Sequence, residues 1–108
     1  MILEVAFFQV DPQRDPDFRE AIHAASPIIA RARGYLGHTV HRCQETPGRY
    51  LLLVQWQTLA DHLEGFRQSS DFQLWRGILG PFFLSPPIVE HYDLIYPESY
   101  SIYSHSKS

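Results

Sequence analysis

The sequence YLLLVQWQTLADHLEGFRQSSDFQLWR, residues 50–76, decides the fold of this chain. Its first seven residues predict a buried strand, because Leu51, Leu52, Leu53 and Val54 place apolar side chains on both faces. In a small sheet with one face exposed to water, a strand is expected to be apolar on one side only. The pattern therefore predicts helices on one face of the sheet and a second copy of the chain over the other.

Two short helices are expected after this strand. Thr58 is predicted to cap the first helix and Ser70 the second. Residues at helical spacing share an inner face in each helix: Leu59, His62, Leu63 and Phe66 in the first, and Phe72, Trp75, Ile78 and Leu79 in the second. We expect a pocket where these faces meet the sheet.

The chain before this stretch predicts a strand, a helix and a second strand. Residues 2–10 are β-branched and aromatic, which is typical of a strand. Asp15 is the expected N-cap of a helix that runs to Gly34, and Pro27 is expected to kink or interrupt it near residues 24–26. The second strand is expected over residues 35–44, with Leu36 and Val40 on one face.

A hairpin turn and a final strand complete the pattern. Thr46-Pro47-Gly48-Arg49 predicts a type II turn, and residues 88–94 predict the last strand. The order of elements is that of the ferredoxin-like split βαβ unit, an α+β fold with a four-stranded antiparallel sheet and helices on one face. Two such sheets facing each other form a dimeric α/β barrel. We expect one domain over residues 1–95 and a polar C-terminal tail over 96–108.

Composition excludes several classes of function. The chain has 108 residues and a net charge of −3, and its lysine and arginine side chains form no cluster, which argues against nucleic-acid binding. No apolar run is long enough for a membrane span, and no signal peptide is visible. Cys43 is the one cysteine, so a reducing cytoplasm is the expected location.

Several segments resemble one known family. They are GYLGH at 34–38, the strand at 50–56 with Asp61-His62 beyond it, GFR at 65–67 followed by FQLWR at 72–76, and VEHY at 89–92. With them, residues 2–95 resemble the antibiotic biosynthesis monooxygenase domain of the dimeric α/β-barrel superfamily. The resemblance implies a homodimer with a pocket between helices and sheet in each subunit. It also implies oxygen chemistry with no metal, flavin or haem as a cofactor.

The haem-degrading branch of the superfamily fits this sequence poorly. That branch uses an Asn in the first strand, a Trp in the helix after the third strand and a His in the next helix. The comparable positions here hold Ala6 or Phe7, Phe66 and Arg76. None of the three matches, so the resemblance disfavours haem degradation.

Oxygenation without a cofactor requires a base that removes a proton from an electron-rich substrate. His62 is the first candidate, because it lies on the inner helix face and histidine titrates near neutral pH. His91 is the second candidate, and it is alternatively expected to fill the interface between two sheets. Tyr92 is expected to orient a phenolic oxygen or to serve as a core aromatic residue.

The expected substrate-binding residues are mostly aromatic. They are His38, Trp56, Phe66, Phe72 and Trp75, and each has the alternative of plain core packing. His38 and His41 are three residues apart on a strand and so point to opposite faces, which disfavours a shared metal ion. We predict no metal site among the six histidines.

Three functions remain open from the sequence. The first is a monooxygenase that needs no cofactor and acts on a quinol-like or anthrone-like aromatic substrate. The second is a non-catalytic dimeric module that binds a small aromatic ligand. The third is a cyclase or isomerase on the same fold, which would use the same base and pocket without oxygen.

Overall fold

The computed structural model describes residues 1–97 and has the predicted order of elements. The strands are β1 (Ile2–Gln9), β2 (Tyr35–Arg42), β3 (Arg49–Trp56) and β4 (Ile88–Asp93). The helices are α1 (Asp15–Ala30) and α2 (Ser70–Leu79), with shorter helical turns η1 (Pro12–Arg14), η2 (Asp61–Phe66) and η3 (Gly80–Phe82). The part of the expected tail from residue 98 onward lies outside the described residues.

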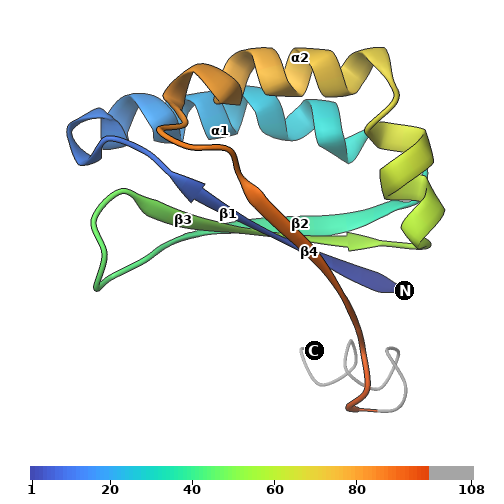
Figure 1. Cartoon of the computed structure of the whole chain (residues 1–108). Coiled ribbons are helices and arrows are strands. Elements are labelled where there is room, and N and C mark those ends of the chain that lie inside the picture. Colours follow the sequence, from blue (N-terminus) through green and yellow to red (C-terminus); the bar gives the residue numbers. More distant parts are fainter. Residues whose placement is uncertain (98–108) are drawn as a thin grey trace.

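The sheet is antiparallel with the strand order β2-β3-β1-β4, and both long helices cover one of its faces (Figure 1). This confirms the ferredoxin-like α+β fold. The sheet of a single chain is open and does not close into a barrel. Among residues 1–97, no helix combines the length and the apolar character needed to cross a bilayer.

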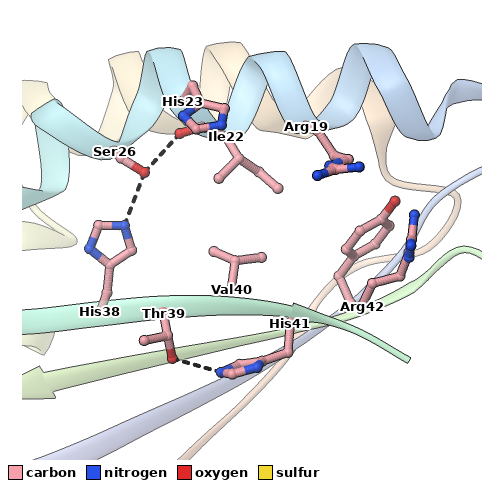
Figure 2. Close-up of a pocket in the computed structure, with 10 residues that line it drawn as sticks. Arg19, Ile22, His23, Ser26, His38, Thr39, Val40, His41 and Arg42 are labelled. Atoms are coloured by element: carbon pink, nitrogen blue, oxygen red, sulfur yellow. Dashed lines mark hydrogen bonds between the residues drawn. The ribbon is translucent and has the colours of Figure 1, made fainter. Parts of the chain in front are cut away.

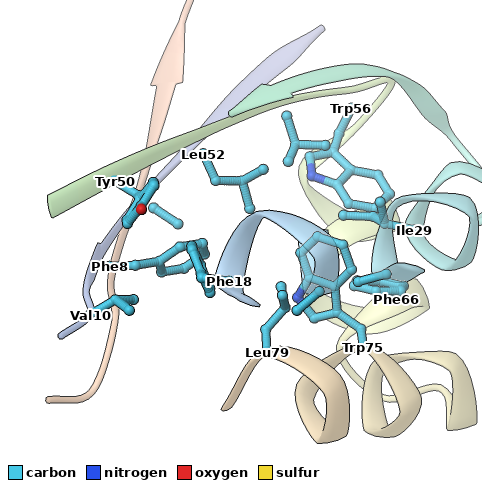
Figure 3. Packing of buried hydrophobic residues seen from close by; sticks show 14 residues of the cluster. Phe8, Val10, Phe18, Ile29, Tyr50, Leu52, Trp56, Phe66, Trp75 and Leu79 are labelled. Carbon is cyan, nitrogen blue, oxygen red and sulfur yellow. The ribbon is translucent and has the colours of Figure 1, made fainter. Parts of the chain in front are cut away.

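The core lies between the helices and the sheet (Figure 3). Val54 and Trp56 of β3 and Phe18 of α1 are fully buried there. Each side chain of this kind contributes about 1.5–3 kcal/mol through burial of apolar surface. The stretch at residues 50–56 therefore supplies the centre of the core, as its apolar pattern predicts.

The prediction for α1 was wrong in two details. The helix runs without interruption through Pro27, and its first residue is Asp15, so Asp15 does not cap it. Asp11 instead caps the preceding turn η1 by accepting a hydrogen bond from the Gln13 backbone N–H. A carboxylate oxygen of Asp15 pairs with Arg42 at the end of β2, at 2.9 Å.

Three other local predictions were also wrong. Ser69, not Ser70, caps α2, because its hydroxyl accepts the Phe72 backbone N–H at 3.2 Å. Leu59 is exposed and does not share the inner face of His62. Leu36 is half exposed because a bulge between Tyr35 and Gly37 breaks the alternation of β2.

The predicted turn between β2 and β3 is confirmed. The Arg49 N–H donates to the Thr46 carbonyl at 3.2 Å, and Gly48 has φ +80°. A positive φ at the third position is what a type II turn requires, and glycine adopts it without strain.

Candidate functional site

A cavity of about 510 Å³ lies between α2 and the helix-covered face of the sheet. Its wall is mostly apolar, and its floor carries two buried ionisable side chains, Glu4 and His62. Two arginine side chains, Arg67 and Arg76, also line it. The remaining lining residues come from β1, β3, α2, η3, β4 and the segment between η3 and β4: Ala6, Phe8, Leu52, Phe72, Trp75, Gly80, Phe83, Leu84, Ser85, Pro86, Pro87 and Val89.

At the floor of this cavity, Glu4 and His62 are joined by close polar contacts to two side chains outside its lining, Trp56 and His91. Trp56 donates its indole N–H to Oε1 of Glu4 at 2.9 Å. Nε2 of His62 lies 3.3 Å from the same oxygen. Nδ1 of His62 lies 2.8 Å from Nε2 of His91. We call this chain, Trp56–Glu4–His62–His91, the relay.

The sheet register brings the relay residues together. Glu4 of β1 pairs directly with His91 of β4 and with Val54 of β3, so Glu4 and His91 point to the helix-covered face. Trp56 is the last residue of β3, and its ring stacks on the His62 ring with centroids 5.2 Å apart. Three strands and one helical turn therefore build the relay.

The turn η2 holds His62 in place. The Thr58 hydroxyl accepts the Asp61 backbone N–H, and the Asp61 carboxylate accepts the Thr58 N–H, so each caps the other and the predicted cap at Thr58 is confirmed. The Arg67 N–H donates to the His62 carbonyl, five residues back, which is a π-helical bond. Single π-helical turns often occur at functional sites.

Burial sets the protonation of the relay. Burial, with His91 and Arg67 nearby, lowers the pKa of His62 to about 4, so its ring is neutral near pH 7. Burial also lowers the pKa of His91. Burial raises the pKa of Glu4, and the Trp56 hydrogen bond opposes this. A carboxylate whose pKa is raised is a stronger base than an exposed one.

Both ring nitrogens of His62 are engaged by protein partners. His62 therefore cannot accept a proton from a ligand unless one of these contacts opens. Both contacts to Glu4 use Oε1, which leaves Oε2 for a ligand in the cavity that Glu4 lines. Oε2 of Glu4 is therefore the atom of the relay left to contact a ligand, and His62 and His91 lie behind it.

The structure brings some predicted site residues together and separates others. His62, Phe72 and Trp75 line the cavity. Trp56 and Phe66 are buried in the core beside it, and Figure 3 shows both rings near Trp75.

Two placements are corrections. Tyr92 is neither a core residue nor a cavity residue: it pairs with Leu3 on the opposite face of the sheet, and its hydroxyl donates to Glu90. His91 is on the helix-covered face against His62, so it does not fill an interface on the open face. His38 faces the helices but lines a different cavity, beside α1.

Glu4 and Arg67 are the residues that sequence reasoning missed. A signal for Glu4 was present, because it is the one charged residue in an otherwise apolar strand at residues 2–8. A charge at such a position is either solvent-exposed or buried with partners. No group of three or more His, Cys, Asp or Glu in the described part of the chain is placed to hold a metal ion.

Known proteins share this sequence and fold. The sequence model of the family described as antibiotic biosynthesis monooxygenase matches residues 1–77. The Bacillus subtilis (strain 168) protein YczJ, named as uncharacterised, is 41% identical over 92 residues, which are 85% of this chain and 97% of YczJ.

Two crystal structures extend the comparison. A Bordetella bronchiseptica protein assigned to antibiotic biosynthesis monooxygenases is 44% identical, has a TM-score of 0.83, and matches 87% of this chain and 96% of its own. A mutant of SnoaB, a cofactor-independent oxygenase from Streptomyces nogalater, is 17% identical with a TM-score of 0.72, over 89% of this chain and 96% of its own. At that identity SnoaB is similar in fold alone.

Proposed function

Because the chain belongs to the antibiotic biosynthesis monooxygenase family, we propose that it oxidises an electron-rich aromatic substrate with molecular oxygen, using Glu4 as the base. The observation that carries the proposal is the relay: a buried carboxylate, supported by two neutral histidines, at the floor of a mostly apolar cavity. The name of SnoaB, a cofactor-independent oxygenase of the same fold, supports the same class of reaction.

The substrate we propose is an anthrone or a hydroquinone. Loss of a proton makes such a ring electron-rich enough to give electrons to oxygen directly. For an anthrone, oxygen adds at the ring CH₂ as a hydroperoxide, and loss of one water molecule leaves a new carbonyl group. The cavity of about 510 Å³, with Phe72 and Trp75 in its wall, is within the usual range for a small aromatic ligand.

Each relay residue has a separate role in this proposal. Oε2 of Glu4 takes the proton, and the Trp56 indole N–H and the His62 ring hold the carboxylate in place. His91 fixes the tautomer of His62 and links the relay to β4. Arg67 and Arg76 line the cavity and stabilise the anion that forms when the substrate loses its proton.

The test is oxygen uptake with anthrone and with menadiol, after subtraction of the rate without protein. Glu4→Gln keeps the shape of the side chain and an oxygen that accepts the Trp56 bond, but it cannot act as a base. We expect it to lower the protein-dependent rate at least about 100-fold, since a positioned base is worth roughly 10²–10⁴. Glu64→Gln, an exposed change on η2, is the matched control.

Two outcomes would count against the proposal. One is the absence of protein-dependent uptake across a broad panel of hydroquinones and anthrones. The other is full activity in Glu4→Gln.

A second candidate function is a non-catalytic module that binds a small aromatic ligand. The engagement of both His62 ring nitrogens favours it, because a histidine held in this way can be purely structural. The two functions differ in their response to substitution. In an oxygenase, His62→Ala abolishes turnover; in a binding module it matters little, and Trp75→Ala weakens ligand binding more.

A further inference from the structure

A second cavity, of about 390 Å³, lies between α1 and the edge strand β2 (Figure 2). It shares no lining residue with the cavity of the relay. Buried aromatic rings of the core, Phe8, Phe18 and Tyr50, pack against one another between the two cavities. The second cavity is therefore a separate site, and the relay does not explain it.

The second cavity is polar at both ends and apolar in the middle. Figure 2 shows Arg19 and Arg42 at one end, and His38 with Ser26 at the other. Ile22 of α1 and Val40 of β2 face each other between the ends. This layout suits an elongated ligand with an anionic group, an apolar body and a polar group at the far end.

The polar end at His38 is held by hydrogen bonds and is neutral. The His38 ring lies 3.0 Å from the Ser26 hydroxyl through Nε2 and 2.6 Å from the Tyr35 hydroxyl through Nδ1. Burial lowers the pKa of His38, so the ring is uncharged at neutral pH. The Ser26 hydroxyl donates to the Ile22 carbonyl at 2.8 Å and thereby accepts from His38. The Ser26 oxygen keeps one lone pair, which can accept a hydrogen bond from a neutral donor group of a ligand.

The net charge of the side chains at the arginine end of the cavity is +1, which matches a ligand with one negative charge. Arg42 is already paired with Asp15, whose other oxygen, Oδ1, is buried without a hydrogen-bond partner among the described residues. Arg19 has no hydrogen bond or ion pair within residues 1–97. One free guanidinium suits a carboxylate better than a doubly charged phosphate.

The side chains of Thr39 and His41 do not take part. They bond to each other and point to the opposite face of the sheet, because Thr39 pairs with Leu53 and His41 with Leu51. Figure 2 shows both on the side of the strand away from α1. His23 belongs to α1 at the edge of the cavity and is exposed.

Tyr50 supplies an independent indication of a ligand. Its side chain is 2% exposed and lines the cavity, yet its hydroxyl has no hydrogen-bond partner among the described residues. A buried hydroxyl without a partner is costly, because it gives up its bonds to water on folding. A phenylalanine at this position would avoid that cost, so the hydroxyl points to a hydrogen-bond partner beyond the described residues, such as a ligand in the cavity.

We propose that this second cavity binds a small aromatic or aliphatic monocarboxylate, with the carboxylate between Arg19, Arg42 and the Tyr50 hydroxyl and a neutral hydrogen-bond donor against the Ser26 oxygen. The apolar body lies between Ile22 and Val40. This site is distinct from the relay and does not depend on the reaction proposed there.

The test is a calorimetric titration of the full chain with 4-hydroxyphenylacetate, and with its neutral amide as the matched ligand. We expect saturable binding of the acid and roughly tenfold weaker binding of the amide, because a charge-assisted bond is lost. Inorganic phosphate, titrated alone and as a competitor, measures whether the site accepts a dianion instead; phosphate binding in preference to the acid would overturn the monocarboxylate assignment.

Three variants test whether the acid binds in the second cavity. Arg19→Gln is expected to weaken binding of the acid at least about tenfold, and Arg33→Gln, an arginine beyond the end of α1 that lines neither cavity, to leave it unchanged. Tyr50→Phe is expected to weaken binding roughly fivefold while the melting temperature without ligand stays the same or rises. That pair of effects separates a ligand role from a folding role.

Several results would overturn the proposal. They are the absence of saturable binding up to about 10 mM acid, or equal binding by wild type and Arg19→Gln. Binding lost in Arg76→Gln but not in Arg19→Gln would assign the acid to the cavity of the relay and would refute the proposed site.

Discussion

At the scale of single residues, the neutral His62 ring ties the stability of the fold to pH. The unfolded state takes up a proton near pH 6.5, while burial holds the pKa of the folded state at about 4. Between these values the unfolded state binds more protons, so stability falls as the pH is lowered through this window. The full loss is about 3 kcal/mol for this group, from roughly 1.4 kcal/mol for each pH unit.

Glu4 acts in the opposite direction. Its folded-state pKa is raised above 4.5, so its contribution to stability is fully present below pH 4.5 and is lost as the pH rises through the folded value. We expect urea unfolding at pH 7 and pH 4.5 to show a smaller difference for His62→Gln than for wild type. His23→Gln, an exposed change, should keep the wild-type difference; an unchanged difference in His62→Gln would contradict the assignment.

Two glycines give a matched prediction. Gly34 has φ +82°, and a Cβ there would collide with the Asp61 side chain, which accepts a hydrogen bond from the Thr58 hydroxyl at the start of η2. Gly77 lies inside α2 with open space around it. We expect Gly34→Ala to lower the free energy of unfolding by more than about 1 kcal/mol and Gly77→Ala to raise it by up to about 1 kcal/mol. Thermal unfolding of the two variants checks both signs.

For single residues, the sequence predicted which side chains are buried better than it predicted which side chains they contact. His62 was predicted to be inward because helical spacing fixes the face of a helix. Its contacts with Glu4 and His91 join residues 58 and 29 positions away, and no local pattern encodes such distances. Tyr92 was misplaced for a related reason, since alternation along β4 gives two faces but not which one meets the helices.

At the scale of elements, the start of α2 gives the sharpest prediction. Ser69 and Ser70 are adjacent serines, but only the Ser69 hydroxyl accepts the Phe72 N–H. Ser69→Ala should therefore lower the free energy of unfolding by about 1 kcal/mol, whereas Ser70→Ala should change it little. Chemical denaturation of both variants measures this, and equal effects would contradict the assignment of the cap.

Proline inside α1 shows why an element can survive a residue that should break it. Pro27 removes the bond to the His23 carbonyl, four residues earlier, and both residues are exposed. The carbonyl that is set free is on the exposed side of the helix and can bond to water, so the helix continues through Pro27 instead of ending. Burial of the apolar side of α1 stabilises the helix by more than the backbone hydrogen bond lost at Pro27 costs.

At the scale of the whole molecule, no helix among residues 1–97 covers the second face of the sheet (Figure 1). Leu3, Val5 and Phe7 of β1 and Leu51 and Leu53 of β3 share this face, opposite the helices. We propose that two copies pack these faces together, as the apolar pattern of β1 and β3 predicts. Burial of such a patch favours association.

The assembly can be tested by mass in solution. We expect sedimentation equilibrium at micromolar concentration to give the mass of a dimer for wild type and of a monomer for Phe7→Glu. Leu74→Glu, on the outer side of α2 where the side chain is 52% exposed, should remain dimeric. A monomeric wild type would refute the proposal.

The overall topology was predictable, because strand and helix periods are properties of short segments. The two cavities were not, because they depend on how side chains from distant segments fill the space between helices and sheet. His38 illustrates this: its face was predicted correctly, but it lines the cavity beside α1 and not the one beside His62.

The pairing of Glu4 with His91 has a consequence for how the protein is made. β1 lies inside the sheet between β3 and β4, and its partner β4 is the last of these strands to be synthesised. Until residues 88–93 have left the ribosome, β1 keeps one open hydrogen-bonding edge, and such an edge is prone to pairing with another chain. The same late event supplies His91, so a nascent or truncated chain that lacks β4 carries an incomplete relay.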